Sequence, residues 1–177
     1  MPNHVHLILT PSTVEALGRA MGEAHRRTTS FVNARARWSG HLFQGRYASV
    51  AMDEAHLIAA VRCVSLNPVR ARLVRRAEDW AWSSVGAHLS GEDDGLVRAR
   101  PVLDRVERFG QLIADGEEAE RRYDGALHAL RSSETTGRPL GPTDFVEDLE
   151  RRLGRRLARR GRGRKPQTEP EKHASLF

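Results

Sequence analysis

The sequence contains one cysteine, two lysines, few aromatic residues and no long apolar run. Cys63 is the only cysteine among 177 residues, which excludes an internal disulfide framework and a cysteine-cluster zinc site. No apolar stretch approaches the roughly 18 residues that a membrane span requires. Hydrophobic residues make up 39% of the chain, which is low for a globular protein but too high for complete disorder. These features predict a cytoplasmic protein with no membrane partner.

The basic residues are almost all arginine, and they are unevenly placed. Lys165 and Lys172 are the only lysines, so 27 of the 29 basic residues are arginine. Residues 101–150 carry six cations and twelve anions, whereas residues 151–177 carry ten cations and two anions. The formal net charge of +6 therefore hides an acidic stretch followed by a basic tail. Such a tail indicates either contact with a polyanion such as nucleic acid or a solvated chain end.

Apolar spacing predicts two strands and several helices. Residues 4–9 and 47–52 have the short apolar, β-branched pattern of strands. Elsewhere apolar residues recur with helical spacing, and a capping box at 12–15 and Asp53 mark two helix starts. Pro68 is expected near the end of the second helix. The predicted helices cover residues 12–37, 53–68, 102–109, 117–132 and a segment that begins at Thr143.

Two histidines stand out because of their spacing. In a strand, residues two apart point to the same face, so His4 and His6 would project side by side. Two neighbouring imidazoles can share one divalent cation. The same pair also fits an ordinary surface strand, so the residue pattern alone leaves both interpretations open. We expect the other histidines of the first 130 residues at the surface: His25, His41, His56, His88 and His128.

Several ordered segments of the chain resemble one protein family. Residues 2–9 (Pro-Asn-His-Val-His-Leu-Ile-Leu) are similar to the metal-binding strand of the HUH (His-hydrophobic-His) single-strand nucleases. The chain more narrowly resembles the IS200-like transposases and their relatives, the REP-associated tyrosine transposases. The other matching segments are residues 40–47, 66–74 and 79–84, with residues 138–141 and 145–155 similar to the C-terminal region of the REP-associated branch.

The resemblance implies a fold and a domain organisation. The expected fold class is α+β, with a small, mainly antiparallel sheet and flanking helices like the RRM-like (ferredoxin-like) palm of HUH nucleases. Residues 1–90 would form the transposase domain, residues 91–158 a helical C-terminal region, and residues 159–177 a disordered basic tail. Family members carry strands and a helix ahead of the HUH strand, so we expect a transposase domain that lacks its upstream strands.

The resemblance also implies an activity and its ligands. Family members nick and join single-stranded DNA at palindromic hairpins through a 5′-phosphotyrosine, with Mg²⁺ or Mn²⁺ and no small-molecule cofactor. By position, His4 and His6 match the HUH metal ligands and Asn67 matches the third ligand. The implied partner is single-stranded, hairpin or palindromic DNA, and the implied location is the nucleoid.

The chain departs from the family at the nucleophile. The family tyrosine lies four residues before the asparagine of the Asn-Pro pair, and here that position is Cys63. A cysteine side chain is shorter by a whole ring, so strand cleavage is expected to be impaired. Tyr47 is a candidate substitute nucleophile, although packing or base stacking is the other interpretation of it. The alternative functions are a non-catalytic hairpin-binding or regulatory module and the product of a decayed gene.

Basic side chains supply the predicted DNA contacts. Residues 161–166 resemble the Arg-Gly-Arg core of an AT-hook, interrupted by a lysine before the proline. Arginines of the first predicted helix could follow a phosphate backbone, or they could form a solvated helix face. The candidate DNA-binding residues are Arg26, Arg27, Arg35, Arg37, Arg46, Arg70, Arg162, Arg164 and Lys165.

Overall fold

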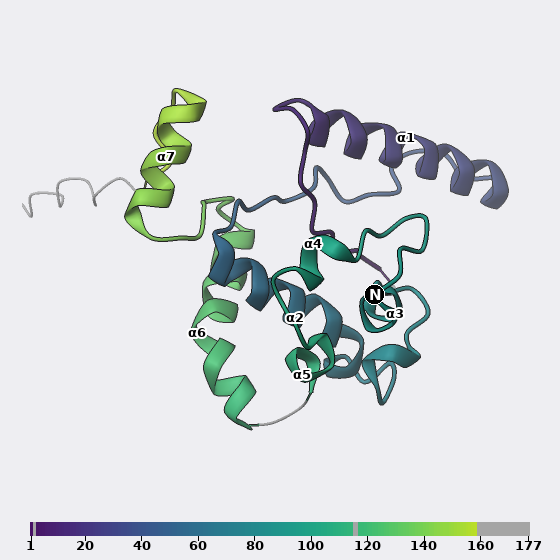
Figure 1. Cartoon of the computed structure of the whole chain (residues 1–177). Coiled ribbons are helices and arrows are strands. Elements are labelled where there is room, and N and C mark those ends of the chain that lie inside the picture. Colours follow the sequence, from purple (N-terminus) through teal and green to yellow (C-terminus); the bar gives the residue numbers. More distant parts are fainter. Residues whose placement is uncertain (2, 115–116, 159–177) are drawn as a thin grey trace, which may run out of the picture.

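Helices form the regular structure of this chain (Figure 1). The computed structural model describes residue 1, residues 3–114 and residues 117–158. The predicted basic tail at 159–177 therefore lies outside the described residues. In chain order the elements are α1 (Ala16–Ala36), α2 (Glu54–Arg70), the 3₁₀ helix η1 (Ala77–Asp79), α3 (Val85–Ser90), α4 (Arg100–Leu103), α5 (Phe109–Ile113), α6 (Glu117–Glu134) and α7 (Thr143–Leu153).

The predicted α+β fold with an antiparallel sheet is wrong for the part of the chain that the structure describes. The only β-type pairing found there is a single parallel bridge between Met52 and Leu140. The amide of Asp53 donates to the carbonyl of Leu140 at 2.9 Å, and the amide of Leu140 donates to the carbonyl of Ala51 at 2.8 Å. Residues 4–9 and 47–52 do not pair with each other, and a strand without a neighbour cannot build a sheet.

Helix α2 is the centre of the core. It begins where predicted, because the Asp53 carboxylate accepts a hydrogen bond from the amide of His56 at 2.9 Å. Val61 and Leu66 of α2 are buried against α5, α6 and η1. Each such side chain contributes about 1.5–3 kcal/mol through burial. The core contains residues from both sides of the predicted domain boundary at residue 91: Val61, Leu66, Ala77, Val85, Phe109 and Leu112.

A buried arginine lies within this core. Arg62 has no solvent exposure, and its Nη2 donates to the carbonyl of Ala114 at 3.3 Å. Its guanidinium lies 5.7 Å from the ring centre of Tyr123 in α6, within the range of a cation–π contact. Nε and Nη1 have no hydrogen-bond partner among the described residues. Arg62 thus joins α2 to the end of α5 and to α6, but its charge is only partly compensated.

The ends of two helices differ from the sequence prediction. Ser12 does not cap α1, which begins at Ala16 after a turn in which the carbonyl of Thr13 accepts the Ala16 amide at 3.2 Å. Pro68 does not end α2, which continues to Arg70. A proline this close to a helix end removes one backbone hydrogen bond without disturbing many later turns. Two short helices, α4 and α5, replace the single helix predicted over 102–109.

Helix α1 lies outside the core and buries none of its residues. It ends at Ala36 because Arg37 adopts a left-handed backbone conformation with φ 55°. Asn33 holds the turn that follows: its carbonyl accepts the Trp38 amide at 2.9 Å, and its side-chain amide donates to the carbonyl of Gly40 at 3.0 Å. The chain then runs back beneath α1 toward α2 (Figure 1). This arrangement leaves α1 and the returning segment as a separate layer.

Helix α7 also buries no residue, and a carboxylate closes its C-terminal end. Gly154 follows the helix with a left-handed φ of 62°. Glu150 Oε1 then accepts hydrogen bonds from the amides of Leu157 and Ala158 at 2.6 and 2.8 Å. These bonds lower the pKa of Glu150. No helix in the described ranges is long and apolar enough to cross a membrane.

His88 is buried, although the sequence predicts it at the surface. It lies in α3 with its ring 4.8 Å from that of Phe109, and Nδ1 has no partner within the described chain. Burial lowers the pKa of His88, and the nearby Asp94 only partly offsets this. His56, also predicted at the surface, is half-buried, with Nδ1 2.6 Å from the Asp53 carboxylate.

The burial of His88 predicts a loss of stability in acid. In the unfolded chain this imidazole takes up a proton near pH 6.5. The folded ring binds the proton only at lower pH, so the unfolded state gains protons first and the free energy of unfolding falls below about pH 6.5. We expect His88→Leu to weaken this pH dependence, measured by urea denaturation at pH 7 and pH 5. His128→Leu, at an exposed position, is the control. If both variants lose the same free energy of unfolding between pH 7 and pH 5, the prediction is contradicted.

Candidate nucleic-acid interface

His4 and His6 lie side by side in an extended N-terminal segment. Their ring centres are 4.9 Å apart with the planes almost perpendicular, and both residues are exposed. His4 Nδ1 lies 2.7 Å from Asn3 Oδ1. This contact fits the tautomer that donates through Nδ1, in which Nε2 would keep its lone pair for a metal ion. The structure therefore brings together the two histidines that the sequence singles out.

The environment of His6 favours a neutral ring. Partial burial is the largest cause that lowers the pKa of His6, and the neighbouring His4 lowers it further. Glu134, at the end of α6, acts in the opposite direction. A neutral imidazole is the form that binds a metal ion, so the pair fits two of the ligands of a divalent cation.

Asn67, the predicted third ligand, lies in α2, an element separate from the segment that carries the pair. No hydrogen bond or ring contact connects it with His4 or His6 in the described chain. It lies in the last turn of α2, about 20 Å along the helix from Glu54 at a rise of about 1.5 Å per residue. Nor do any three His, Cys, Asp or Glu side chains of the described residues gather closely enough to hold a metal ion. The contact between His4 and His6 is the part of the predicted ligand set that the structure displays directly.

Cys63 and Tyr47 lie on different elements. Cys63 is half-buried in α2, one turn before Asn67 and next to the buried Arg62. Tyr47 is exposed in the segment that returns beneath α1, and its hydroxyl lies 3.7 Å from the position that a Cβ on Gly18 would occupy. The structure therefore places the candidate substitute nucleophile against α1. Arg70 ends α2 and is half-buried.

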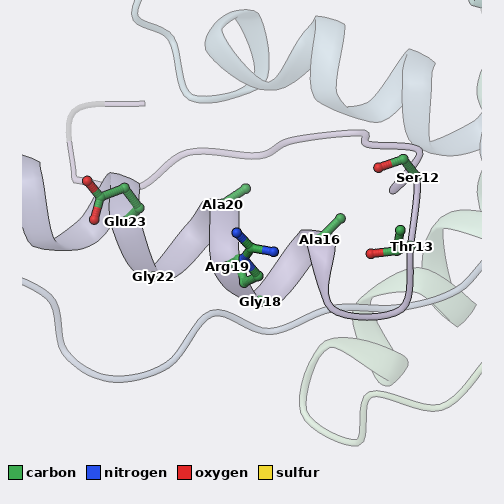
Figure 2. Close-up of a pocket in the computed structure, with 8 residues that line it drawn as sticks. All are labelled: Ser12, Thr13, Ala16, Gly18, Arg19, Ala20, Gly22 and Glu23. Carbon is green, nitrogen blue, oxygen red and sulfur yellow. The ribbon is translucent and has the colours of Figure 1, made fainter.

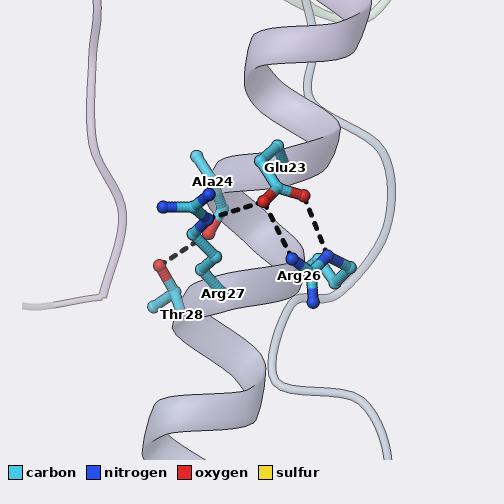
Figure 3. A network of polar contacts seen from close by, with 5 residues as sticks. All are labelled: Glu23, Ala24, Arg26, Arg27 and Thr28. Atoms are coloured by element: carbon cyan, nitrogen blue, oxygen red, sulfur yellow. Dashed lines mark hydrogen bonds and ion pairs between the residues drawn. The ribbon is translucent and has the colours of Figure 1, made fainter.

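Two of the candidate arginines share one carboxylate as their ion-pair partner (Figure 3). Glu23 accepts hydrogen bonds from Arg26 at 2.8 Å and from Arg27 at 2.6 Å. These bonds lower the pKa of Glu23 to about 2. All three side chains are solvent-exposed, so the ion pairs add little to stability. They do compete with any phosphate for the two guanidinium groups.

A shallow groove lies at the N-terminal end of α1 (Figure 2). Its volume is about 840 Å³, and small residues such as Ala16, Gly18, Ala20 and Gly22 form much of its wall. Figure 2 shows Arg19 and Glu23 on the same stretch of helix. Because its walls are mostly small and apolar, this groove offers few groups that could bind a ligand specifically.

The strongest chemical feature of the N-terminal region is a set of exposed aromatic rings among arginines. Phe31 and Trp38 are 66% and 68% exposed. Phe31 and Arg35 are four residues apart on α1 and so lie on one helix face. Arg35, Arg37 and Arg46 are exposed, and no carboxylate forms an ion pair with them among the described residues. We use the name aromatic–arginine surface for these exposed residues of α1 and the segment that follows it: Phe31, Arg35, Arg37, Trp38, Phe43, Arg46 and Tyr47. Phe31 lies on a different face of α1 from His25 and Gly18, the residues that Phe43 and Tyr47 approach, so the named residues are spread around the helix.

Local contacts hold parts of this surface in place. The ring of Phe43 stacks on that of His25 in α1, with 4.0 Å between the ring centres and 17° between the planes. Asn33 fixes the turn that carries Trp38, as described above. The returning segment therefore keeps its aromatic residues beside α1. The sequence prediction included the arginines but missed Phe31, Trp38 and Phe43, because helical spacing does not reveal that α1 stays unburied.

Comparison with known proteins adds no further identification. No protein-family model, curated protein or solved structure matches the chain. The resemblance to single-strand transposases therefore stays a prediction from the motifs. Three candidate DNA-binding residues of the tail, Arg162, Arg164 and Lys165, lie outside the described residues.

The histidine pair predicts weak binding of Mn²⁺. At pH 7.5 the paramagnetic ion should broaden the imidazole NMR signals of His4 and His6 far more than those of the exposed His128. His6→Ala should remove the effect at His4, and the effect should weaken as the pH falls because protons compete with the metal ion for imidazole nitrogens. Asn67→Ala should change nothing. Broadening of His128 to the same extent, or loss of binding on Asn67→Ala, would contradict a two-histidine site.

Proposed function

We propose that this protein binds single-stranded DNA, as a transposase-like protein similar to the REP-associated group. The aromatic–arginine surface is the observation that carries the proposal. Proteins that bind single strands combine cations that follow the phosphates with aromatic rings on which the bases stack. Phe31 and Trp38 offer such rings, and Arg35 and Arg46 offer cations without a carboxylate partner among the described residues.

The motif order of the chain supports DNA hairpins as the ligand. Segments at 2–9, 40–47, 66–74 and 79–84 follow one another as in the single-strand transposases. The second of these segments contributes Phe43, Arg46 and Tyr47 to the aromatic–arginine surface. The resemblance and the surface chemistry thus lead to the same ligand class by separate arguments. Mg²⁺ or Mn²⁺ at His4 and His6 would supply the phosphate-polarising charge used in the family's reaction.

In this proposal the protein binds DNA without cutting it. Cys63 holds the place of the family tyrosine, and its short, half-buried side chain cannot extend to a phosphate as a tyrosine does. Tyr47 lies against Gly18, and no contact joins it to the histidine pair in the described chain. A protein that binds hairpins without cutting them could also regulate them, and this non-catalytic regulatory module is the alternative that the same observations favour.

The first test measures binding of a fluorescent hairpin oligonucleotide with a single-stranded flank. We expect Trp38→Ala to weaken binding about tenfold, because a stacked base contributes about 1–3 kcal/mol. The Arg35→Gln and Arg46→Gln substitutions should each lower the slope of log K against log salt by about 0.7. Fluorescence anisotropy between 50 and 200 mM salt gives both quantities.

Matched controls exist elsewhere on the chain. Trp82 and Arg75 are exposed but lie outside the aromatic–arginine surface. Trp82→Ala and Arg75→Gln should therefore leave affinity and salt slope almost unchanged. Equal losses in the surface variants and in these controls would refute the proposed interface. If the chain binds a blunt duplex and the hairpin with equal affinity, its binding is nonspecific electrostatic attraction to DNA.

The second test concerns cleavage. The native chain, incubated with a labelled hairpin and Mn²⁺, should form no covalent protein–DNA adduct on a denaturing gel. Cys63→Tyr should bind the hairpin as well as the native chain and still form no adduct, because the described residues contain no group of three His, Cys, Asp or Glu side chains that could hold the metal ion. An adduct with the native chain would refute the proposal that the protein does not cut DNA. Loss of that adduct in Tyr47→Phe would identify Tyr47 as the nucleophile.

A further inference from the structure

The N-terminal segment at 3–10 has a backbone without partners. It is extended, and none of its amide or carbonyl groups forms a backbone hydrogen bond with the rest of the described chain. The one hydrogen bond made there joins the side chains of Asn3 and His4. An extended segment with such free groups is a template for pairing with another strand.

The side chains of this segment do nothing to prevent such pairing. Val5, Leu7 and Leu9 are 69%, 56% and 52% exposed, and their alternation places them on one face of the segment. Proteins protect exposed edges with lysine, glutamate or inward-pointing charges, and residues 3–10 contain no such residue. Pro11 ends the stretch, because proline has no amide to donate.

The order of the side chains is self-complementary for antiparallel pairing. If Leu7 faces Leu7 of a second copy, Val5 faces Leu9 and Leu9 faces Val5, so one face of the ribbon is wholly apolar. A shift by two residues in either direction places Leu9 opposite Asn3, or Val5 opposite Pro11. A shift by one residue places histidines opposite leucines and mixes the two faces. Only the Leu7-centred register pairs every apolar residue of this face with another.

We propose that residues 4–10 pair with the same segment of a second copy of the chain in an antiparallel, two-fold ribbon centred on Leu7. A two-fold contact of this kind uses the same surface on both copies, as most homodimers do. The pairing fills the free backbone groups along one edge and covers the exposed face of Val5, Leu7 and Leu9. It also places both histidine pairs on the opposite face of the ribbon, because His4 and His6 alternate with the apolar residues.

Disulfide trapping tests the register directly. In a Cys63→Ser background, Leu7→Cys should form a disulfide-linked dimer under mild oxidation, because directly opposed residues lie within disulfide distance. Val5→Cys alone and Leu9→Cys alone should not form such a dimer, because position 5 of one copy faces position 9 of the other. An equal mixture of those two variants should cross-link well above either one alone. Non-reducing gels of the full chain provide the measurement.

Sedimentation of the unmodified full chain tests the association itself. The native protein should show a concentration-dependent monomer–dimer equilibrium, and Leu7→Lys should shift it to monomer because two like charges would then face each other. Helix content should stay unchanged, since residues 3–10 lie outside the core. Leu96→Lys, at an exposed leucine outside the segment, and Trp38→Ala should both leave the dimer intact, which separates this contact from DNA binding.

Three results would overturn the proposal. They are a monomer at every concentration tested, a dimer that survives Leu7→Lys, and self-cross-linking of Val5→Cys as efficient as that of Leu7→Cys. The last result would show association in a different register. None of them depends on whether the aromatic–arginine surface binds DNA.

Discussion

The burial of one face of α2 is the interaction on which the folded part of this chain depends. Val61 and Leu66 meet residues of η1, α5 and α6, which come from segments far apart in the sequence. Arg62 shares this position, so a charged side chain lies at the centre of the packing. Elements that pack neither on α2 nor on its neighbours η1, α5 and α6 receive little burial. Helix α1 and the N-terminal segment are the main examples.

The lack of burial gives the N-terminal part its chemistry. Phe31 and Trp38 remain in solvent next to arginines, and His4 and His6 remain on an extended segment with free backbone groups. Large exposed apolar groups commonly mark sites of interaction. Here the two exposed features differ in kind. The aromatic–arginine surface suits a polyanion with flat bases, whereas the segment at 3–10 suits another strand.

Local signals gave a mixed result. Asp53 caps α2 as predicted, because a cap and its helix are neighbours in the chain, whereas the capping box at 12–15 does not cap α1. Helix α7 begins at Thr143 as predicted, without a side-chain cap. The sheet was predicted wrongly, because a strand forms only when a distant segment pairs with it. The sequence pattern of residues 4–9 shows that they suit a strand, but it does not supply the partner. His88 was misplaced for the same reason, since its burial depends on Phe109 in another helix.

The sequence by itself determined the candidate chemistry: two histidines at strand spacing, a single cysteine, and basic residues that are almost all arginine. Local spacing also accounts for the contact of His4 with His6 and for the ion pairs of Glu23 with Arg26 and Arg27 within α1. The tertiary structure decided which groups are buried and which stay exposed. His88 lies in the core against Phe109, whereas Phe31 remains in solvent because α1 packs outside the core. The spacing of residues can be seen in the sequence, whereas the exposure of a side chain depends on which distant segments pack against it.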